Sequence, residues 1–322
     1  MADIRYDIIG DIHGHVLELR QLLQTLGYRE AGEGYIHPEK KRKPLFVGDY
    51  IDRGSESVEV LDLVMGMEQA GEALALMGNH EFNALCYHTP GEAGEPLRPH
   101  TAKNTKQHEA TLAGLARHNT SFSKYRDWLL SLPLFLEEDG FRAVHACWDE
   151  TRIAFLRDRM PAARLSDSLL TEAAARGSEL YDAVEVVLKG REIDLPEGLF
   201  FYDKDGHIRY NMRIRWWENP EGATYNDLRV KPDCDCGDAP VVLDLLPDRW
   251  HYGSAEKPVF FGHYWLQGDP ALFRHNVCCL DYSIGKGETL AAYTWDGKPK
   301  LSPGNFTAIR HRMHGWGAIR SV

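Results

Sequence analysis

The 322-residue sequence contains no long hydrophobic run. No apolar stretch approaches the ~20 residues that a membrane-spanning helix needs. The apolar run at 6–9 is also too short, and its flanks are too polar, for the core of a signal peptide. We therefore expect a cytoplasmic protein that has no membrane partner.

An excess of positive charge is also missing. The chain has 37 Lys and Arg residues against 48 Asp and Glu residues, which gives a formal net charge of −11. A nonspecific nucleic-acid binder needs a basic surface, so we expect no nucleic-acid binding. A phosphorylated substrate is compatible with this charge if a metal ion supplies positive charge at the site.

Cysteine is scarce, with six residues in the whole chain. In a cytoplasmic protein of this size, free thiols are expected rather than a disulfide framework. Cys234 and Cys236 are spaced like half of a metal clip, but no second pair at zinc spacing accompanies them. A structural zinc ion is therefore not the favoured interpretation.

What the sequence does contain is a set of polar motifs, each directly behind a short apolar run. They are GDIHG at 10–14, GDYIDRG at 48–54 and GNHE at 78–81. Each run is expected to form a strand whose carboxyl end delivers Asp, Asn or His side chains. Because open α/β sheets bind ligands at this end of their strands, the motifs predict one site assembled from several loops.

Helical spacing of apolar residues is found between these strands. It predicts a helix over 16–26, which Gly27 ends, and a second helix that begins near Ser55 or Ser57. The polar segment 32–43 is expected to form a surface hairpin or loop. With strands at 44–47 and 73–77, the N-terminal part has the order βα-βα-β, which is typical of a mostly parallel sheet.

The remainder of the chain is less regular. After a loop at 88–106, the expected elements are helices at 107–117 and 122–131, strands at 134–136 and 141–144, helices within 165–188, strands within 199–217, and strands at 258–261, 277–281 and 289–294. The last two strands are expected to be antiparallel around a turn at 285–287, and 302–322 shows little periodicity. We divide the chain into the first half of a core (1–150), an insertion or lid (151–255), and the second half of the core with a tail (256–322).

Six side chains at the expected strand ends form a candidate metal site. They are Asp11, His13, Asp49, Asn79, His145 and His263. Six oxygen and nitrogen ligands, one of them a carboxylate placed to bridge, can hold two divalent cations, and a set without cysteine suits manganese, iron or zinc. Two such cations form a clamp for displacement at phosphorus and turn a shared water molecule into a nucleophile. Taken singly, His145 is better explained as a core histidine, and Asp49 or Asp52 as a helix cap.

The sequence closely resembles the calcineurin-like metallophosphoesterases in five ordered motifs. These are GDIHG, GDYIDRG, GNHE, a later His behind a strand, and GHYW at 262–265. The second and third are most similar to the phosphoprotein phosphatase branch, which also includes bacterial dinucleoside tetraphosphatases. The resemblance covers 1 to about 150 and 256 to about 296. It implies an α/β (α+β) fold, a two-sheet β-sandwich flanked by helices, and leaves the insertion, a helical-plus-strand subdomain, unexplained.

The resemblance implies a role for each matching residue. One metal ion would take Asp11, His13 and Asp49, and the second would take Asp49 as a bridge, Asn79, His145 and His263. His80 matches the general acid that protonates the departing oxygen, and Asp52 matches the carboxylate that orients it. Arg53 matches the arginine that holds the phosphoryl oxygens. A second phosphate-binding arginine is expected between the last two histidines, where Arg213 and Arg215 are the candidates, with Arg152 behind them.

Several neighbouring residues have ordinary explanations. Glu81 is expected to be a charge at a helix N-terminus, which the helix dipole favours. His15 is expected on the surface and Asp281 in a turn. The tryptophans are expected in the core or in a wall of the site, and Trp265 is the one nearest to a predicted ligand.

The predicted function is a binuclear metal-dependent phosphoesterase, with manganese as the first expectation and iron or zinc as alternatives. A Ser/Thr-type protein phosphatase-like phosphomonoesterase comes first, because the Asp52–Arg53 pair favours it. A bis(5'-nucleosyl)-tetraphosphatase-like hydrolase of dinucleoside polyphosphates is the alternative, because a large insertion can close over a small substrate. An enzyme that acts on small phosphomonoesters or phosphodiesters is a further open alternative. A rival of another class is a catalytically silent scaffold that binds phosphorylated partners.

Overall fold

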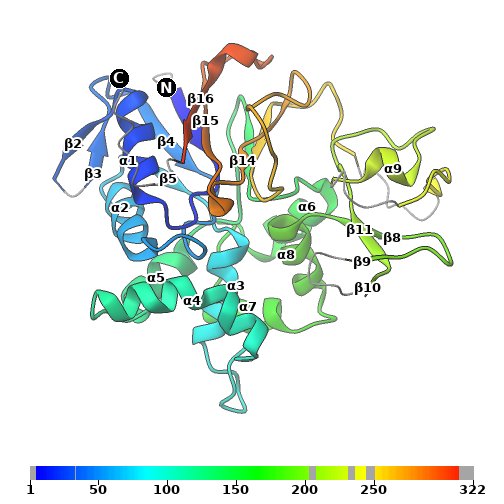
Figure 1. The fold of residues 1–322 in the computed structure, drawn as a ribbon, viewed down its shortest axis with the longest axis horizontal. Coiled ribbons are helices and arrows are strands. Elements are labelled where there is room, and N and C mark those ends of the chain that lie inside the picture. The colour runs from blue at the N-terminus through cyan, green and yellow to red at the C-terminus, as the bar shows by residue number, and fades with distance from the viewer. Residues whose placement is uncertain (1–4, 33, 203–207, 231–235, 244–250, 312–322) are drawn as a thin grey trace, which may run out of the picture.

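The computed structural model describes residues 5–32, 34–202, 208–230, 236–243 and 251–311. Two β-sheets pack face to face in these ranges, and helices cover their outer sides (Figure 1). The α/β sandwich predicted from the motifs is therefore the observed fold. No helix in the described ranges is long and apolar enough to span a membrane.

The larger sheet has the strand order β14-β15-β1-β4-β5, with β16 added beside β15. Its strands are β1 (Arg5–Ile9), β4 (Arg42–Phe46), β5 (Leu74–Ala75), β14 (Asp281–Tyr282), β15 (Thr289–Trp295) and β16 (Phe306–Arg310). As predicted, β1, β4 and β5 are parallel. Strand β15 runs antiparallel to β1 and β16, so the sheet is mixed.

The smaller sheet has the strand order β13-β12-β7-β6. Its strands are β6 (Phe135–Glu137), β7 (Arg142–Val144), β12 (Val259–Phe261) and β13 (Val277–Cys279). Strands β6 and β7 form the predicted hairpin, whereas β12 is parallel to both β7 and β13. The parallel pairing places the carboxyl ends of β7 and β12 at one edge of this sheet.

Side chains that alternate along the strands form two separate hydrophobic clusters, one on each face of the larger sheet. Ile8 belongs to the cluster between the sheets, together with Phe141 and Phe260 of the smaller sheet. The next residue, Ile9, points the other way and packs in the main cluster with Leu19 of α1 (Val16–Thr25). Successive side chains of a strand face opposite sides, so one apolar run supplies both layers.

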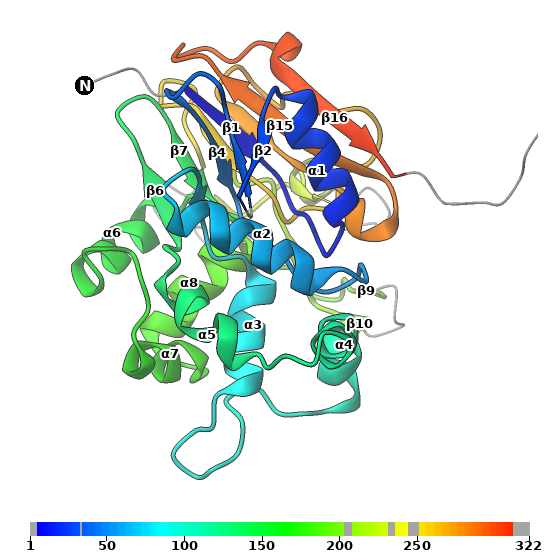
Figure 2. The ribbon, with the colours of Figure 1, turned by 90° about the vertical axis from the view of Figure 1, so that its left-hand side faces the viewer.

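Helices pack on the sheets and below them. Figure 2 shows α1 and α2 on the outer side of the larger sheet, and α3, α4, α5, α7 and α8 beneath the sandwich. The helices are α1, α2 (Ser57–Gln69), α3 (Asn79–His88), α4 (Ala102–Arg117), α5 (Ser123–Ser131), α6 (Glu150–Arg159), α7 (Asp167–Ala174), α8 (Glu179–Lys189) and α9 (Tyr225–Leu228), with 3-10 turns η2 (Ile284–Lys286) and η3 (Pro303–Asn305).

Several predicted boundaries were wrong. The loop predicted at 88–106 ends early, because Thr101 caps α4 by accepting a hydrogen bond from the amide of Asn104. The helix α6 was not predicted, although Asp149 caps it in the same way. The tail also contains an unpredicted strand, β16. Cys234, residues 203–207 and the last eleven residues lie outside the described residues.

The stretch predicted as one strand at 277–281 is in fact divided between the two sheets. Strand β13 is parallel to β12, and only β14 is antiparallel to β15 as predicted. The chain crosses from the smaller to the larger sheet at Leu280, which is buried between them. A run that is buried on both sides has no alternation that would mark the crossing, so the sequence hides it.

The segment 151–255 contains two kinds of packing. Its helices α6 to α8 contribute Ile153, Leu170 and Val184 to the main cluster. Its strands β8 (Glu192–Asp194), β9 (Phe201–Tyr202), β10 (Ile208–Arg209) and β11 (Asn211–Arg213) lie with α9 at the right of Figure 1. Residues of this second part, such as Met212 and Leu228, form a small cluster of their own. We propose that 151–255 is the insertion, with boundaries as predicted.

Candidate functional site

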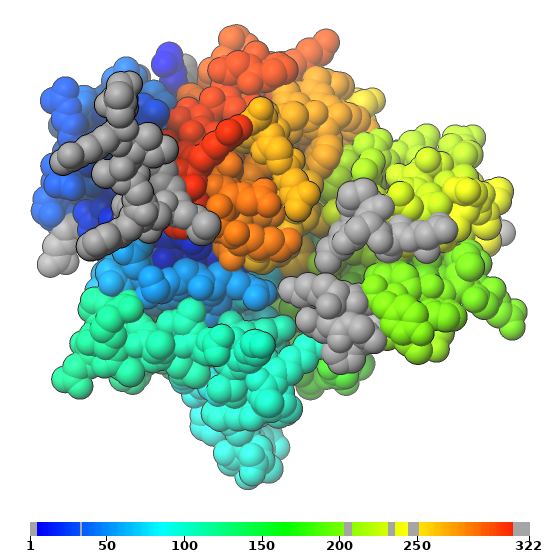
Figure 3. Space-filling view, viewed as in Figure 1, coloured from blue at the N-terminus to red at the C-terminus, as the bar shows by residue number. Residues whose placement is uncertain are grey.

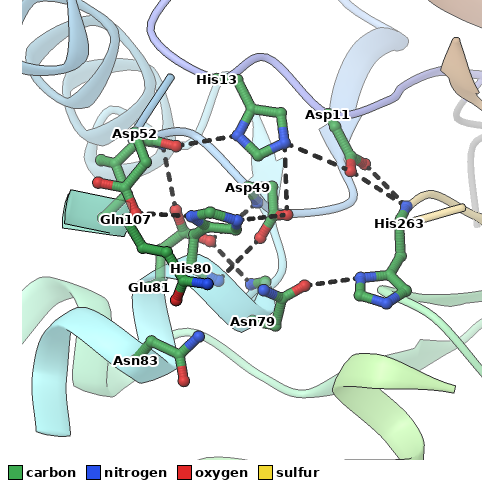
Figure 4. Close-up of polar contacts among 12 residues, drawn as sticks. Asp11, His13, Asp49, Asp52, Asn79, His80, Glu81, Asn83, Gln107 and His263 are labelled. Carbon is green, nitrogen blue, oxygen red and sulfur yellow. Dashed lines mark hydrogen bonds and ion pairs between the residues drawn. The ribbon is translucent and has the colours of Figure 1, made fainter. Parts of the chain in front are cut away.

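The structure brings the six predicted metal ligands together at the carboxyl edges of both sheets. Figure 4 shows Asp11, His13, Asp49, Asn79 and His263 close together. Asp11 and His13 follow β1, Asp49 follows β4 and Asn79 follows β5, all in the larger sheet. His145 follows β7 and His263 follows β12 in the smaller sheet. All six side chains are buried. Their convergence follows from the sandwich, because the carboxyl edges of the two sheets meet.

The backbone of these loops is unusual. His13, Asp49 and His263 have left-handed φ angles of 46°, 54° and 75°. Non-glycine residues in this region are strained, and such strain is found most often at functional sites. At Gly48, with φ of 108°, an added Cβ would lie 2.6 Å from the Cα of Gly78. Glycine is therefore required where the two ligand loops pass each other.

Asp49 lies at the centre of the ligand set. Its Oδ2 is 3.6 Å from Nε2 of His13, and its Oδ1 is 3.4 Å from Nε2 of His145. On the His145 side, Oδ1 of Asn79 is 3.1 Å from Nε2 of His145 and 2.6 Å from Nδ1 of His263. On the other side, Oδ2 of Asp11 is 4.0 Å from Nε2 of His13. The two carboxylate oxygens of Asp49 thus face two different groups of ligands.

The tautomers of two histidines fit a pair of bound cations. Nδ1 of His13 donates to the carbonyl of Ile51 at 3.0 Å, and Nδ1 of His145 donates to that of Val47 at 2.9 Å. Histidines that bind metals usually donate their other ring N–H in this way. Each Nε2 lone pair then points at oxygen acceptors of Asp49, an arrangement that a cation between them would relieve. Nε2 of His13 is buried without a hydrogen-bond partner among the described residues.

The electrostatics of the site also fit cations. Burial, together with the charge of His80, lowers the pKa of His13 to about 3, so its imidazole is neutral and free to bind a metal ion. Burial raises the pKa of Asp11 well above its usual value, and the nearby Asp281 and Asp49 add to the effect. Burial opposes ionisation of Asp49 too, but His145 and His80 hold its pKa well below the usual value. Without a metal ion, burial opposes the charged form of His145, but Asp49 outweighs it and raises the pKa of His145. A bound cation would take the place of the proton on Nε2 of His145. A cluster of buried carboxylates needs such positive partners.

His80 and Asp52 form a close pair beside the ligands. Nδ1 of His80 is 2.6 Å from Oδ2 of Asp52, and Nε2 is 4.0 Å from Oδ2 of Asp49. Burial opposes the charged imidazole, but Asp49 and Asp52 outweigh it and raise the pKa of His80 to about 9. The side chain therefore holds a proton at neutral pH and can act as an acid in the cleft.

Glu81 lies at the N-terminus of α3, as predicted, but it also binds backbone amides of two ligand loops. Its buried carboxylate accepts hydrogen bonds from the amides of Asp49 and Tyr50 at 2.8 Å, and from that of Gly78 at 3.0 Å. It therefore fastens the loop after β4 to the start of α3. Its place three residues after Gly78, within GNHE, was the available signal.

Asp281 was expected in a turn, and this prediction was wrong. It lies in β14 and is buried, where Oδ2 accepts from the amide of Trp265 at 2.7 Å and Oδ1 accepts from that of Ser283 at 2.9 Å. The bond from Trp265 holds the loop that follows His263. No local pattern signalled this role, because the partner loop is 16 residues away in the sequence.

Arg53 and Trp265 flank the ligand set on the open side. The ring of Trp265 is stacked on His13, with centroids 5.2 Å apart. The guanidinium carbon of Arg53 lies 5.3 Å from the centroid of that ring, and Nζ of Lys286 lies 4.8 Å from it. Two cations over one tryptophan form a positively charged rim beside His13. Trp265 is thus in the wall of the site.

A cleft of about 1270 Å³ extends from His80 and His263 to the insertion. Among the residues that the structure describes, nine basic side chains line it, against three acidic ones. The basic ones are Arg53, Arg98, Lys103, Arg176, Lys189, Arg209, Arg213, Arg215 and Lys286. Figure 3 shows the insertion, in green and yellow, beside core segments in blue and orange. The cleft is therefore basic in a chain whose net charge is −11.

The structure separates the three arginines proposed for phosphate binding. Arg213 and Arg215 both line the cleft, whereas Arg152 lines a smaller pocket of about 330 Å³ with Arg213. Burial lowers the pKa of His263 well below its usual value, and the positive charge of Arg213 contributes to this shift. Arg213 therefore acts electrostatically on His263, while its guanidinium pairs with Glu192 at 3.2 Å.

Residues 4–195 match the family model described as calcineurin-like phosphoesterase. A segment of 75 residues is 47% identical to a protein of Anoxybacillus flavithermus named bis(5'-nucleosyl)-tetraphosphatase PrpE [asymmetrical], over 23% of this chain and 30% of that protein. A protein of Halalkalibacterium halodurans with the same name is 44% identical over 77 residues, 24% of this chain and 31% of that protein. The matches thus span less than a third of these relatives.

Solved structures with a similar chain trace include two phosphatases. One is a cold-active protein-tyrosine phosphatase of a Shewanella species, with 17% identity, a TM-score of 0.45, and coverage of 97% of this chain and 83% of that chain. The other is a protein serine/threonine phosphatase of Saccharomyces cerevisiae, with 13% identity, a TM-score of 0.46, and coverage of 99% and 82%.

Proposed function

Because the chain belongs to the calcineurin-like phosphoesterase family, we propose that it hydrolyses phosphoesters with the help of two divalent metal ions. The position of Asp49 carries this proposal. Its two carboxylate oxygens face two separate groups of nitrogen and oxygen ligands at 3.6 and 3.4 Å. Such a shared carboxylate is suited to hold two cations side by side.

We assign the ligands as the motifs predict. Asp11, His13 and Asp49 would hold one cation, and Asp49, Asn79, His145 and His263 would hold the other. When bound, the two cations would polarise the phosphoryl group of the substrate and lower the pKa of a water molecule between them. A ligand set of carboxylate, amide and imidazole suits manganese, iron or zinc, and manganese is our first choice.

The other side chains serve the substrate. His80 holds a proton that Nε2 can give to the departing oxygen, and Asp52 keeps Nδ1 of the same ring protonated. Arg53, above the ring of Trp265, is placed to bind phosphoryl oxygens with its planar fork. Arg213 and Arg215 would bind phosphate from the insertion side of the cleft.

A dinucleoside polyphosphate is the substrate that the cleft favours. One phosphoryl group would be neutralised by the metal ions and Arg53, and further basic side chains such as Arg215 and Lys286 line the rest of the cleft. A chain of phosphates would occupy them, and each charge-assisted contact adds affinity. The relatives that match part of this chain are named bis(5'-nucleosyl)-tetraphosphatases, and their names support the same substrate class.

A Ser/Thr phosphomonoester, the first expectation from the sequence, is the second candidate, and the His80–Asp52 pair favours it. The alkoxide that leaves from a serine phosphate is far more basic than the phosphate that leaves from a polyphosphate. It therefore gains more from an acid whose pKa is about 9. The two observations thus favour different substrates.

Hydrolysis of a substrate panel tests both proposals. The purified protein is supplied with manganese and assayed on diadenosine tetraphosphate, a phosphoserine peptide and p-nitrophenyl phosphate, each with and without a chelator. We expect metal-dependent turnover, with the highest kcat/KM for diadenosine tetraphosphate. A higher value for the peptide would favour the phosphoprotein. Absence of metal-dependent turnover on every ester would favour the silent scaffold instead.

A further inference from the structure

His108 is a buried histidine in contact with the carboxylate that orients His80. It lies on α4, a helix to which the motifs give no function, and its Nδ1 is 2.8 Å from Oδ1 of Asp52. The other oxygen of Asp52 is 2.6 Å from Nδ1 of His80. Asp52 is therefore held between two imidazole rings, one on each oxygen.

Hydrogen bonding fixes the protonation of these rings. An ionised carboxylate only accepts hydrogen bonds, so His80 and His108 both donate Nδ1–H to Asp52. Thr111, one turn after His108 on α4, donates its hydroxyl to the same Oδ1 at 2.6 Å. Burial opposes ionisation of Asp52, but the bonds from His108 and His80 lower its pKa well below the usual value.

The far side of His108 is held as well. With Nδ1–H committed to Asp52, the other ring nitrogen of His108, Nε2, lies 3.1 Å from Nε2 of His88, so one of these two nitrogens donates to the other. His88 in turn is stacked on Phe122, with centroids 4.2 Å apart. Both nitrogens of His108 are therefore occupied, and its ring has one favoured orientation.

We propose that His108 is a positioning residue for the acid. It anchors Oδ1 of Asp52, so that Oδ2 stays directed at Nδ1 of His80 and Nε2 of His80 faces the cleft. Without His108, the Thr111 hydroxyl alone would hold Oδ1 among the described residues, and the carboxylate would be freer to turn away from His80. The effect on rate rests on the proposed hydrolase function, but the arrangement of hydrogen bonds does not.

Leaving-group dependence separates positioning from mere support of the fold. His108→Leu removes the donor, whereas His108→Asn keeps an N–H near the position of Nδ1. His118→Asn is the control, because His118 lies exposed at the other end of α4 and pairs with Glu59. The substrates are phenyl phosphate and p-nitrophenyl phosphate, which are similar in size and differ in how much the departing oxygen needs a proton.

We expect His108→Leu to lower kcat about 10- to 100-fold on phenyl phosphate and less than about 3-fold on p-nitrophenyl phosphate, because only the acid is misplaced. His108→Asn should restore most of the loss on phenyl phosphate, and KM should stay nearly constant. An equal loss on both esters, or no loss on either, would overturn the proposal. If His108→Leu does not fold, His108→Gln replaces it, because its longer amide reaches past Asp52.

Proton NMR of the metal-free protein gives a readout that needs no activity. Ring N–H protons bonded to a buried carboxylate give signals far downfield, and we expect one each from His80 and His108. In His108→Leu the signal of His80 should shift or broaden through exchange with water. An unchanged signal of His80 would contradict the positioning role, even if the protein hydrolyses no ester.

Discussion

The two walls of the cleft are built in different ways. On the core side, ligands such as Asp49 and His145 are buried, and their polar atoms contact backbone or carboxylate groups. On the insertion side, Tyr202 of β9 is 62% exposed, and Tyr210, which follows β10, is 65% exposed. The basic side chains of this wall project from a subdomain with a small cluster of its own.

From this difference we infer that the core wall carries out the chemistry and that the insertion wall selects the substrate. Transition-state chemistry requires groups held within a fraction of an ångström, and burial with satisfied hydrogen bonds provides this on the core side. Long basic side chains on the insertion side bind by charge and adapt their shape to the ligand. Changes on the core side should therefore affect kcat and metal content, and changes on the insertion side should affect KM.

Loss of the shared ligand should have the largest effect. Asp49→Asn removes one charge and one acceptor oxygen, so we expect both metal ions to be lost from the purified protein and turnover to fall below detection. Metal content is measured by mass spectrometry alongside the rate on p-nitrophenyl phosphate. Asp127→Asn is the control, since its carboxylate is 92% exposed on α5. Retention of two metal ions by Asp49→Asn would show that Asp49 is not the bridge.

The acid should make the rate depend on pH. The pKa of His80 is about 9, above the ordinary 6.5, so its proton is present at neutral pH and is lost as the pH rises through 9. We expect kcat on phenyl phosphate to fall about tenfold per pH unit above that point, while p-nitrophenyl phosphate is less affected. The same shift stabilises the fold below pH 6.5, and this contribution disappears as the pH rises through 9.

Titration of His80 by NMR in the metal-free protein checks this value directly. The shift depends on Asp49 and Asp52, so Asp52→Asn should lower the pKa of His80. A pKa of His80 at or below 6.5 in the unsubstituted protein would contradict the assignment of this residue as an acid that is protonated at neutral pH.

Glu81 tests how far the core wall depends on its supporting bonds. Glu81→Gln keeps the shape but replaces one acceptor with an NH2 group among the amide donors of Asp49, Tyr50 and Gly78. We expect metal affinity to fall about 10- to 100-fold, as for other groups that orient metal ligands. Metal titration by calorimetry measures this. Glu109→Gln, on the exposed side of α4, should have no effect.

The insertion wall should give the smallest and most selective effect. Arg213→Ala and Arg215→Ala each remove a cation from the cleft lining, so we expect KM for diadenosine tetraphosphate to rise about tenfold. Added salt should reduce the difference in KM between these variants and the unsubstituted protein. The kcat on p-nitrophenyl phosphate should change less than about 2-fold, because this ester is too short to reach along the cleft. A large fall in kcat would instead place the arginine beside the reacting phosphate.

Arg117→Ala is the matched control for the arginine variants. Arg117 is half exposed on α4 and pairs with Glu59, away from the cleft lining. Its removal changes the net charge by the same amount. If Arg117→Ala raised KM as much as Arg213→Ala, the effect would come from overall charge, and the distinction between the walls would fail.

Much of the fold and site could be predicted because local patterns encode them. Apolar runs before Gly10, Gly48 and Gly78 predict strands, and the polar residues behind them predict ligands. The helix over α1 follows from its apolar spacing in the same way. Predictions were poor where a run is buried on both sides, as at the crossing at Leu280, or where a helix depends on its cap, as at Thr101 and Asp149.

By itself, the sequence determined the order of the five motifs and therefore the family of folds and the ligand types. Only the tertiary structure decided what holds those ligands in place. Glu81, Asp281 and His108 act on partners that are 31, 16 and 56 residues away. A hydrogen bond between distant segments leaves no spacing pattern in the chain, because it exists only after two sheets and α4 have packed together. The basic lining of the cleft is likewise a property of the folded surface, hidden in a chain that is acidic overall.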